Sequence, residues 1–130
     1  MLTRHPLDEP VASVAHTVIA DVHATDTLRE AAMRLAINHV GLLVVRRGAL
    51  AVGVLSERDV VAALSEGADV DEARVEEAMT EDIAGVQETA PLRDAATVMA
   101  ANGIRHLLVR RDGRVTGVVS ARDVLAALMA

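Results

Sequence analysis

The sequence predicts an α/β fold made of two tandem copies of one β-α-β-β-α unit. The stretch GVLSERDVVAAL at residues 53–64 returns as GVVSARDVLAAL at residues 117–128, an offset of 64 positions. The same offset aligns residues 25–38 with residues 89–102 without a gap. Two copies are too few for a solenoid, so we expect them to pack on each other as a pseudo-two-fold pair.

The first half of each copy predicts a short extended piece followed by an amphipathic helix. Apolar side chains recur at i, i+3, i+4 and i+7 over residues 28–35 and again over residues 92–99, which is the spacing of one buried helix face. Asn38 and Gly103 stand where these helices are expected to end.

The second half of each copy predicts two paired strands and a further helix. The runs GLLVVRR and IRHLLVRR are short and rich in β-branched and apolar residues. In the second copy, Asp112 and Gly113 form a dipeptide typical of a hairpin turn, which leads into the strand RVTGVVS. Ser56 and Ser120 then stand where the last helix of each copy begins.

The composition narrows the cellular setting and the classes of partner. The chain has 130 residues, no cysteine, no aromatic residue and a formal net charge of -6. It therefore lacks the basic field that collects nucleic acid and the aromatic platforms on which bases stack. The apolar runs are too short to cross a bilayer, and the N-terminal stretch lacks the features of an export signal. We therefore expect a cytoplasmic protein that binds neither nucleic acid nor a membrane.

The repeat also sets the expected domain organisation. We assign residues 11–66 to the first unit and residues 75–130 to the second, with an N-terminal extension over residues 1–10. Residues 67–74, within an acidic stretch of low apolar periodicity, form the expected linker.

Two units of this order resemble a known family. The segment VEEAMT at residues 75–80 and the pattern Gly-h-h-Ser-x-x-Asp before each last helix, where h is an apolar residue, look like paired cystathionine β-synthase (CBS) domains, often called a Bateman module. The resemblance covers roughly residue 11 to the end. It implies two clefts between the units that commonly hold adenosine-containing ligands such as AMP, ADP, ATP, NAD or S-adenosylmethionine.

The repeated motif itself allows two interpretations. Ser56 with Asp59, and Ser120 with Asp123, have the spacing of a capping box, in which each residue bonds the other's backbone N–H at a helix start. A helix N-terminus also suits phosphate, and a neighbouring carboxylate accepts hydrogen bonds from ribose hydroxyls. The resemblance implies the second interpretation, with the aspartates on ribose and the serines on sugar or phosphate.

Cationic residues complete the list of candidate ligand-binding residues. Arg58 and Arg122 recur inside the motif, where each could neutralise a phosphate or pair with a neighbouring acid. Arg105 and His106 stand only in the second copy, opposite Gly41 and Leu42, so the second site is expected to favour the more anionic ligand. Because side chains alternate along a strand, we expect at most one of Arg105 and His106 to face the cleft.

Other chemistry lacks a matching pattern. The five histidines show no metal-binding spacing and are interpreted as scattered surface residues, and no base accompanies either motif serine. We therefore expect no catalytic residue, no structural metal and no enzyme activity. The acidic residues around AMT are interpreted as a solvated linker and helix start, with weak capture of magnesium together with a nucleotide as the alternative: Glu76, Glu77, Glu81 and Asp82.

The leading hypothesis is a regulatory module that senses an adenosine-containing ligand. The resemblance implies a homodimer formed through helices such as VVAAL and VLAALMA, and an output that passes through this assembly or through an effector protein. The alternative is a ligand-free module for protein–protein interaction or dimerisation, in which the motifs serve only as helix starts.

Overall fold

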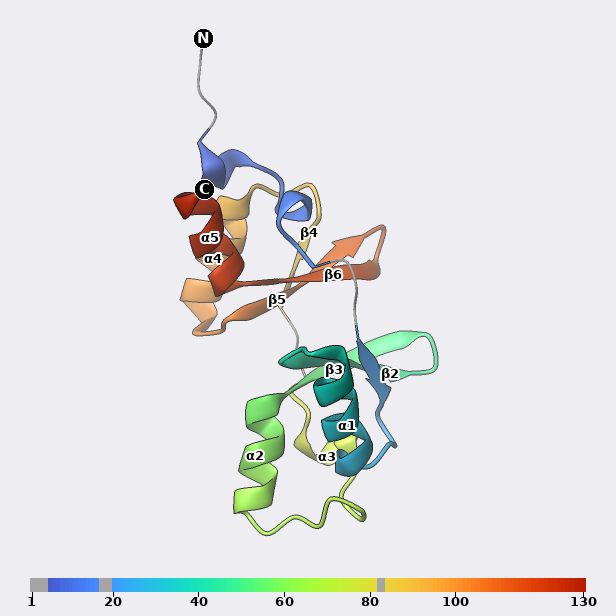
Figure 1. Cartoon of the computed structure of the whole chain (residues 1–130). Coiled ribbons are helices and arrows are strands. Elements are labelled where there is room, and N and C mark those ends of the chain that lie inside the picture. The colour runs from blue at the N-terminus through green and yellow to red at the C-terminus, as the bar shows by residue number, and fades with distance from the viewer. Residues whose placement is uncertain (1–4, 17–19, 82–83) are drawn as a thin grey trace. The chain divides into compact units, whose positions relative to one another are not determined.

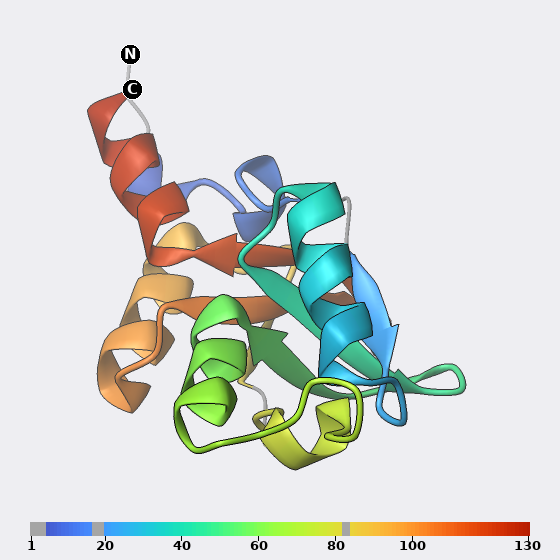
Figure 2. The same ribbon diagram turned by 60° about the horizontal axis from the view of Figure 1, so that its bottom comes forward.

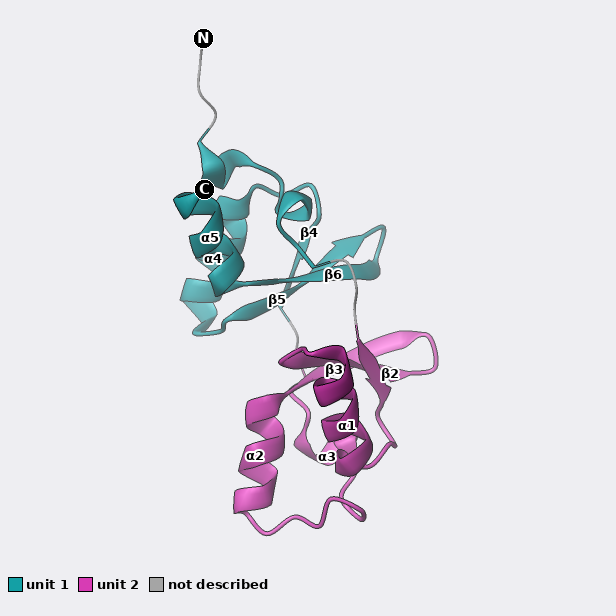
Figure 3. Cartoon of the chain, in the orientation of Figure 1, with its two compact units in different colours: residues 1–19, 84–130 teal, residues 20–83 magenta. Residues whose placement is uncertain are grey.

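The chain folds into two compact units, seen in a computed structural model that describes residues 5–16, 20–81 and 84–130 (Figure 1). Unit 1 comprises residues 1–19 and 84–130, and unit 2 comprises residues 20–83 (Figure 3). Each unit contains one copy of the Ser-x-x-Asp motif, with Asp59 in unit 2 and Asp123 in unit 1. None of the helices in these described ranges is long and apolar enough to cross a membrane.

Unit 2 contains one three-stranded sheet and three α-helices. Its elements are β1 (Asp21–His23), α1 (Leu28–Asn38), β2 (Leu42–Arg47), β3 (Leu50–Ser56), α2 (Glu57–Ser65) and α3 (Val75–Ala78). The strand order is β1-β2-β3, with β1 parallel and β3 antiparallel to β2. The helices α1 and α2 pack on the sheet and on each other (Figures 1 and 2).

Unit 1 repeats this plan. Its elements are the 3₁₀ turns η1 (Pro6–Asp8) and η2 (Val11–Ser13), then β4 (Gly85–Gln87), α4 (Leu92–Asn102), β5 (His106–Arg111), β6 (Arg114–Ser120) and α5 (Ala121–Met129). The sheet order is β4-β5-β6, again with one parallel and one antiparallel pair. The predicted β-α-β-β-α order is therefore confirmed in both copies.

Each unit has its own apolar core at positions that the repeat predicts. In unit 2 the helix residues Leu28 and Leu35 pack with Leu43 of β2 and Leu55 of β3. In unit 1 the equivalent residues build an equivalent cluster between α4, β5 and β6: Leu92, Met99, Leu107 and Val119. Since no described polar side chain is buried, apolar burial holds each unit together.

The chain exchanges the opening segments of the two copies. Val11, at the start of the first copy, is fully buried in the core of unit 1, which is otherwise built from the second copy. Val75 has the matching place in unit 2, and each segment is anchored by a backbone hydrogen bond of 2.8 Å, from Val11 N to Ala90 O and from Val75 N to Asp26 O. The spatial units therefore differ from the consecutive sequence copies. Unit 1 holds most of the second copy, and unit 2 holds most of the first.

The predicted turns and helix ends are in place. Asp112 and Gly113 both have positive φ, 50° and 77°, as the twist of a two-residue hairpin requires. The helix α4 ends at Gly103 in the left-handed region with φ 62°, while α1 ends at His39 with φ 53°. The helix start expected in the acidic run is present as α3, while η1 and η2 were not predicted, because helical segments this short carry no apolar periodicity.

A candidate ligand site at the start of the last helix of each unit

Both motifs form complete capping boxes. In unit 2 the hydroxyl of Ser56 accepts a hydrogen bond from Asp59 N at 3.1 Å, and Asp59 Oδ2 accepts one from Ser56 N at 2.8 Å. Ser120 and Asp123 in unit 1 repeat these bonds at the same two distances. The capping interpretation of the motif is confirmed, and it fixes each aspartate side chain at the first turn of α2 or α5.

The capping bonds leave specific groups for a ligand. Each serine uses its oxygen as an acceptor and keeps its hydroxyl proton, and each capping bond engages one of the two carboxylate oxygens. Another first-turn N–H is already used, because Glu57 N donates to Gly41 O at 3.0 Å and Ala121 N donates to Arg105 O at 2.9 Å. The carboxylate is therefore a stronger ligand-binding feature here than the free helix N-terminus.

The register of the sheets brings the preceding strand to the motif. Leu42 pairs with Ser56, and His106 pairs with Ser120. The bond from Ala121 N to Arg105 O holds the backbone of Arg105 at the start of α5. The structure thus places both predicted cationic residues of the second copy beside Ser120.

The pKa of His106 reflects these neighbours. Partial desolvation lowers the pKa of His106 below its ordinary value of 6.5, although the residue remains exposed at the surface, and the positive charge of Arg105 lowers it further. The charge of Asp123 acts in the opposite direction. The titration of His106 is thus coupled to both predicted ligand-binding neighbours.

The motif arginines lie at the surface, and no described acidic residue pairs with them. Arg58 and Arg122 occupy the second position of α2 and α5, and both are exposed. Within residues 5–16, 20–81 and 84–130, no salt bridge is formed by either. The alternative of pairing with a neighbouring acid is therefore not seen there, and the guanidinium groups are accessible to an anion.

His16 is a member of the unit 1 site that the sequence interpretation missed. Its Nε2 lies 2.9 Å from Asp123 Oδ1, the carboxylate oxygen that the cap does not use. His16 is a surface residue, as predicted, since its side chain is 71% exposed, but the exchanged opening segment, bridged to β6, brings it to Asp123 of α5. The available signal was the offset of 64, which aligns His16 with Thr80 of the AMT segment.

The same repeated unit decides the family. The sequence model of the CBS domain matches this chain twice, over residues 11–66 and 75–130. The chain belongs to the CBS-domain family. The resemblance inferred from the Ser-x-x-Asp motifs is thereby confirmed.

Relatives of this CBS pair include proteins of archaea and bacteria. An uncharacterized 17.7 kDa protein of Acidianus ambivalens is 37% identical over 121 residues, which span 92% of this chain and 73% of that protein. The CBS domain protein of Pyrobaculum aerophilum, solved in complex with AMP, is 31% identical with a TM-score of 0.79, over 92% of this chain and 98% of that one. A CBS-domain containing protein of Agrobacterium tumefaciens is 26% identical with a TM-score of 0.84, over 98% of each chain.

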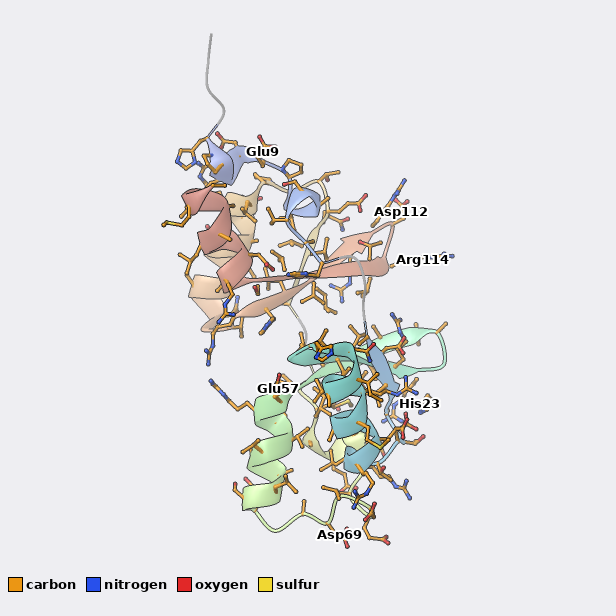
Figure 4. The ribbon with its side chains drawn as sticks, viewed as in Figure 1. Glu9, His23, Glu57, Asp69, Asp112 and Arg114 are labelled. Carbon is orange, nitrogen blue, oxygen red and sulfur yellow. The ribbon has the colours of Figure 1, made fainter. Side chains whose placement is uncertain are left out.

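The two motif sites of this CBS pair differ in charge. Unit 2 has two acids and one arginine at its motif: Glu57, Arg58 and Asp59. Glu57, labelled in Figure 4 at the first turn of α2, reaches back over Gly41, whose added Cβ would lie 3.2 Å from Glu57 Oε1. Unit 1 has alanine in place of Glu57 and has two arginines, one acid and two histidines at its motif: Arg105, Arg122, Asp123, His16 and His106. The unit 1 site is therefore the more favourable one for an anion.

The described residues of this CBS pair contain no arrangement of side chains that would bind a metal ion. No group of three or more histidine, aspartate or glutamate side chains in residues 5–16, 20–81 and 84–130 is arranged to hold a metal ion. Of the acidic run considered for magnesium, Glu76 bonds Arg47 at 2.7 Å and Glu77 accepts from Arg74 N at 3.0 Å. Asp82 lies outside the described residues.

Proposed function

We propose that this CBS pair is a regulatory module that binds adenosine-containing ligands at its two Ser-x-x-Asp motifs. The observation that carries the proposal is the pair of pre-oriented carboxylates, Asp59 and Asp123, each fixed at a helix start with a serine hydroxyl beside it. The AMP bound by the Pyrobaculum aerophilum relative supports this class of ligand.

Each part of a nucleotide has a matching group at the proposed sites. The two hydroxyls of ribose donate hydrogen bonds to the aspartate carboxylate, and the serine hydroxyl donates to an oxygen of the sugar or phosphate. Arg58 in unit 2, and Arg105 with Arg122 in unit 1, neutralise phosphate charge. The adenine lies between aliphatic side chains, because the chain has no aromatic residue on which it could stack.

A regulatory output requires the ligand to favour one assembly state over another. We propose that this assembly is a homodimer formed through α2 and α5, which expose apolar side chains at equivalent positions: Val61 and Leu64 on α2, Leu125 and Leu128 on α5. The ligand shifts such an equilibrium only by its difference in affinity for the two states. An effector protein that reads the dimer completes the proposed pathway.

Isothermal titration calorimetry of the full chain tests the ligand proposal directly. The titrants are AMP, ADP, ATP, NAD and S-adenosylmethionine, each with and without magnesium. We expect saturable binding of at least one titrant, with Asp59→Ala and Asp123→Ala each removing one site. Losing hydrogen bonds to a charged carboxylate costs about 1.5–3 kcal/mol, or roughly 10-fold to 100-fold in Kd.

Asp94→Ala is the matched control for these variants. It removes one exposed carboxylate from the first turn of α4, a helix that carries neither motif, and should leave every Kd unchanged. Because the protein has no Trp or Tyr, its concentration is taken from peptide-bond absorbance. If protein stripped of bound nucleotide gives no heat with any titrant, the completed capping boxes favour the alternative of a ligand-free interaction module.

A further inference from the structure

The carboxylate of Asp123 is already engaged on both sides. Its Oδ2 accepts from Ser120 N at 2.8 Å, and its Oδ1 lies 2.9 Å from His16 Nε2. An ionised carboxylate has no proton to give, so His16 is the donor in this contact. Only 15% of the Asp123 side chain is exposed, which leaves little of the carboxylate open to a ligand.

The backbone of His16 is fixed at this position, whereas its side chain can rotate away from Asp123. His16 N donates to Val118 O at 2.9 Å, and Val118 N donates to His16 O at 3.1 Å, so the segment is bridged to β6. The carbonyl of His16 lies over Gly117, where an added Cβ would approach it to 2.8 Å. The side chain of His16 is 71% exposed and can turn into solvent without disturbing the core.

Unit 2 has the same construction without the histidine. Thr80 is bridged to Val54 by two backbone hydrogen bonds of 2.9 and 3.0 Å, and its carbonyl lies 2.8 Å from the Cβ position of Gly53. Within the described parts of unit 2, no side chain bonds the free carboxylate oxygen of Asp59. The two copies therefore differ at one residue that touches the proposed ligand-binding carboxylate.

We propose that His16 is an internal competitor that occupies Asp123 in the ligand-free chain and must be displaced by the ribose hydroxyls of a ligand. This inference rests on the proposed function, because it concerns the same carboxylate. The cap already takes one acceptor position on Oδ2, so the ribose hydroxyls depend mainly on Oδ1, where the N–H of His16 takes an acceptor position and the imidazole stands in the way. The contact between His16 and Asp123 makes ligand binding at Asp123 weaker than the cationic surroundings of this site alone would give. A ligand at Asp59 meets no such competitor.

The duplicated sequence supplies an exchange experiment that isolates this effect. Calorimetry with AMP as the probe is performed on the full chain in two backgrounds, Asp59→Ala to leave the Asp123 site and Asp123→Ala to leave the Asp59 site. His16→Thr then installs the residue of unit 2 in unit 1, and Thr80→His does the reverse. His16→Ala removes the imidazole as His16→Thr does, but without adding a hydroxyl. Far-UV circular dichroism establishes that each variant is folded.

Opposite changes are expected in the two backgrounds. In Asp59→Ala, His16→Thr and His16→Ala should tighten AMP binding about threefold to tenfold, the size of one hydrogen bond lost by a partly exposed group. In Asp123→Ala, Thr80→His should weaken AMP binding by a similar factor, and His16→Thr should change nothing. The imidazole ¹⁵N signals of His16 should also move on AMP addition toward those of the Asp123→Asn chain.

The possible failures are distinguishable. If AMP binds to the Asp59→Ala chain but adding His16→Thr leaves the Kd for AMP unchanged or raises it, His16 is no competitor. The inference is then overturned while the proposed function stands. If AMP and the other adenosine ligands bind to none of the chains, the proposed function fails and the inference falls with it.

Discussion

At the scale of single residues, His106 marks a chemical difference between the copies. Desolvation, together with the charge of Arg105, lowers its pKa below 6.5, and Leu42 stands at its position in the first copy. A lowered pKa means that the unfolded chain takes up this proton more readily than the folded chain. His106 therefore stabilises the fold above pH 6.5, and that contribution is lost as the pH falls through the lowered pKa.

We expect His106→Leu to make the protein less sensitive to acid. The free energy of unfolding of the wild type should fall more steeply between pH 7 and pH 5 than that of His106→Leu, as measured by urea unfolding monitored by far-UV circular dichroism. Equal slopes for the wild type and His106→Leu would show that the proton taken up by His106 does not affect folding.

At the scale of elements, the helix starts were predictable from local sequence because a capping box is local. Ser56 and Asp59 lie three residues apart, and their spacing predicts the bonds that the structure contains. The hairpin at Asp112 and Gly113 was predictable for the same reason. The contact of His16 with Asp123 spans 107 residues, and no spacing rule connects such partners.

The pairing of each opening segment with a strand, β6 for the first segment and β3 for the second, is equally non-local. The motif glycine permits a close approach of backbone, since Gly117 faces His16 O and Gly53 faces Thr80 O. Two consecutive copies in a sequence do not reveal whether each opening segment packs on its own copy or on the other. The exchange, and hence the membership of His16 in the unit 1 site, required the structure.

We expect Gly117→Ala to destabilise unit 1 by about 1–3 kcal/mol, because its methyl group would stand 2.8 Å from the carbonyl oxygen of His16. Relief of this clash must lengthen the two bonds between His16 and Val118. Urea unfolding measures the loss. Gly41→Ala is the matched control, since its methyl meets only the flexible end of Glu57, and a loss as large as that of Gly117→Ala would contradict the steric explanation.

At the scale of the whole molecule, the exposed apolar residues of α2 and α5 form a repeated feature. Val61 is 64% exposed and Leu125 is 62% exposed at equivalent positions of the two helices. The internal faces of these helices are already satisfied by Val60 and Val124, which are buried in the cores of their own units. Because the outward residues contribute little to either core, their apolar character is the feature on which the proposed packing against a second copy of the chain rests.

Replacing these outward residues should therefore affect assembly and leave folding intact. We expect the wild type to sediment at about twice the chain mass of 13.7 kDa, and Val61→Glu with Leu125→Glu to sediment at the mass of one chain. Four like charges per dimer would be buried in the proposed interface, which is costly without partners. Arg114→Glu, a charge change at the exposed start of β6, is the control and should keep the dimer. A wild-type chain that sediments as a monomer, with and without AMP, would rule out dimer packing as the route by which ligand occupancy is transmitted. The apolar residues of α2 and α5 would then be a candidate surface for an effector protein.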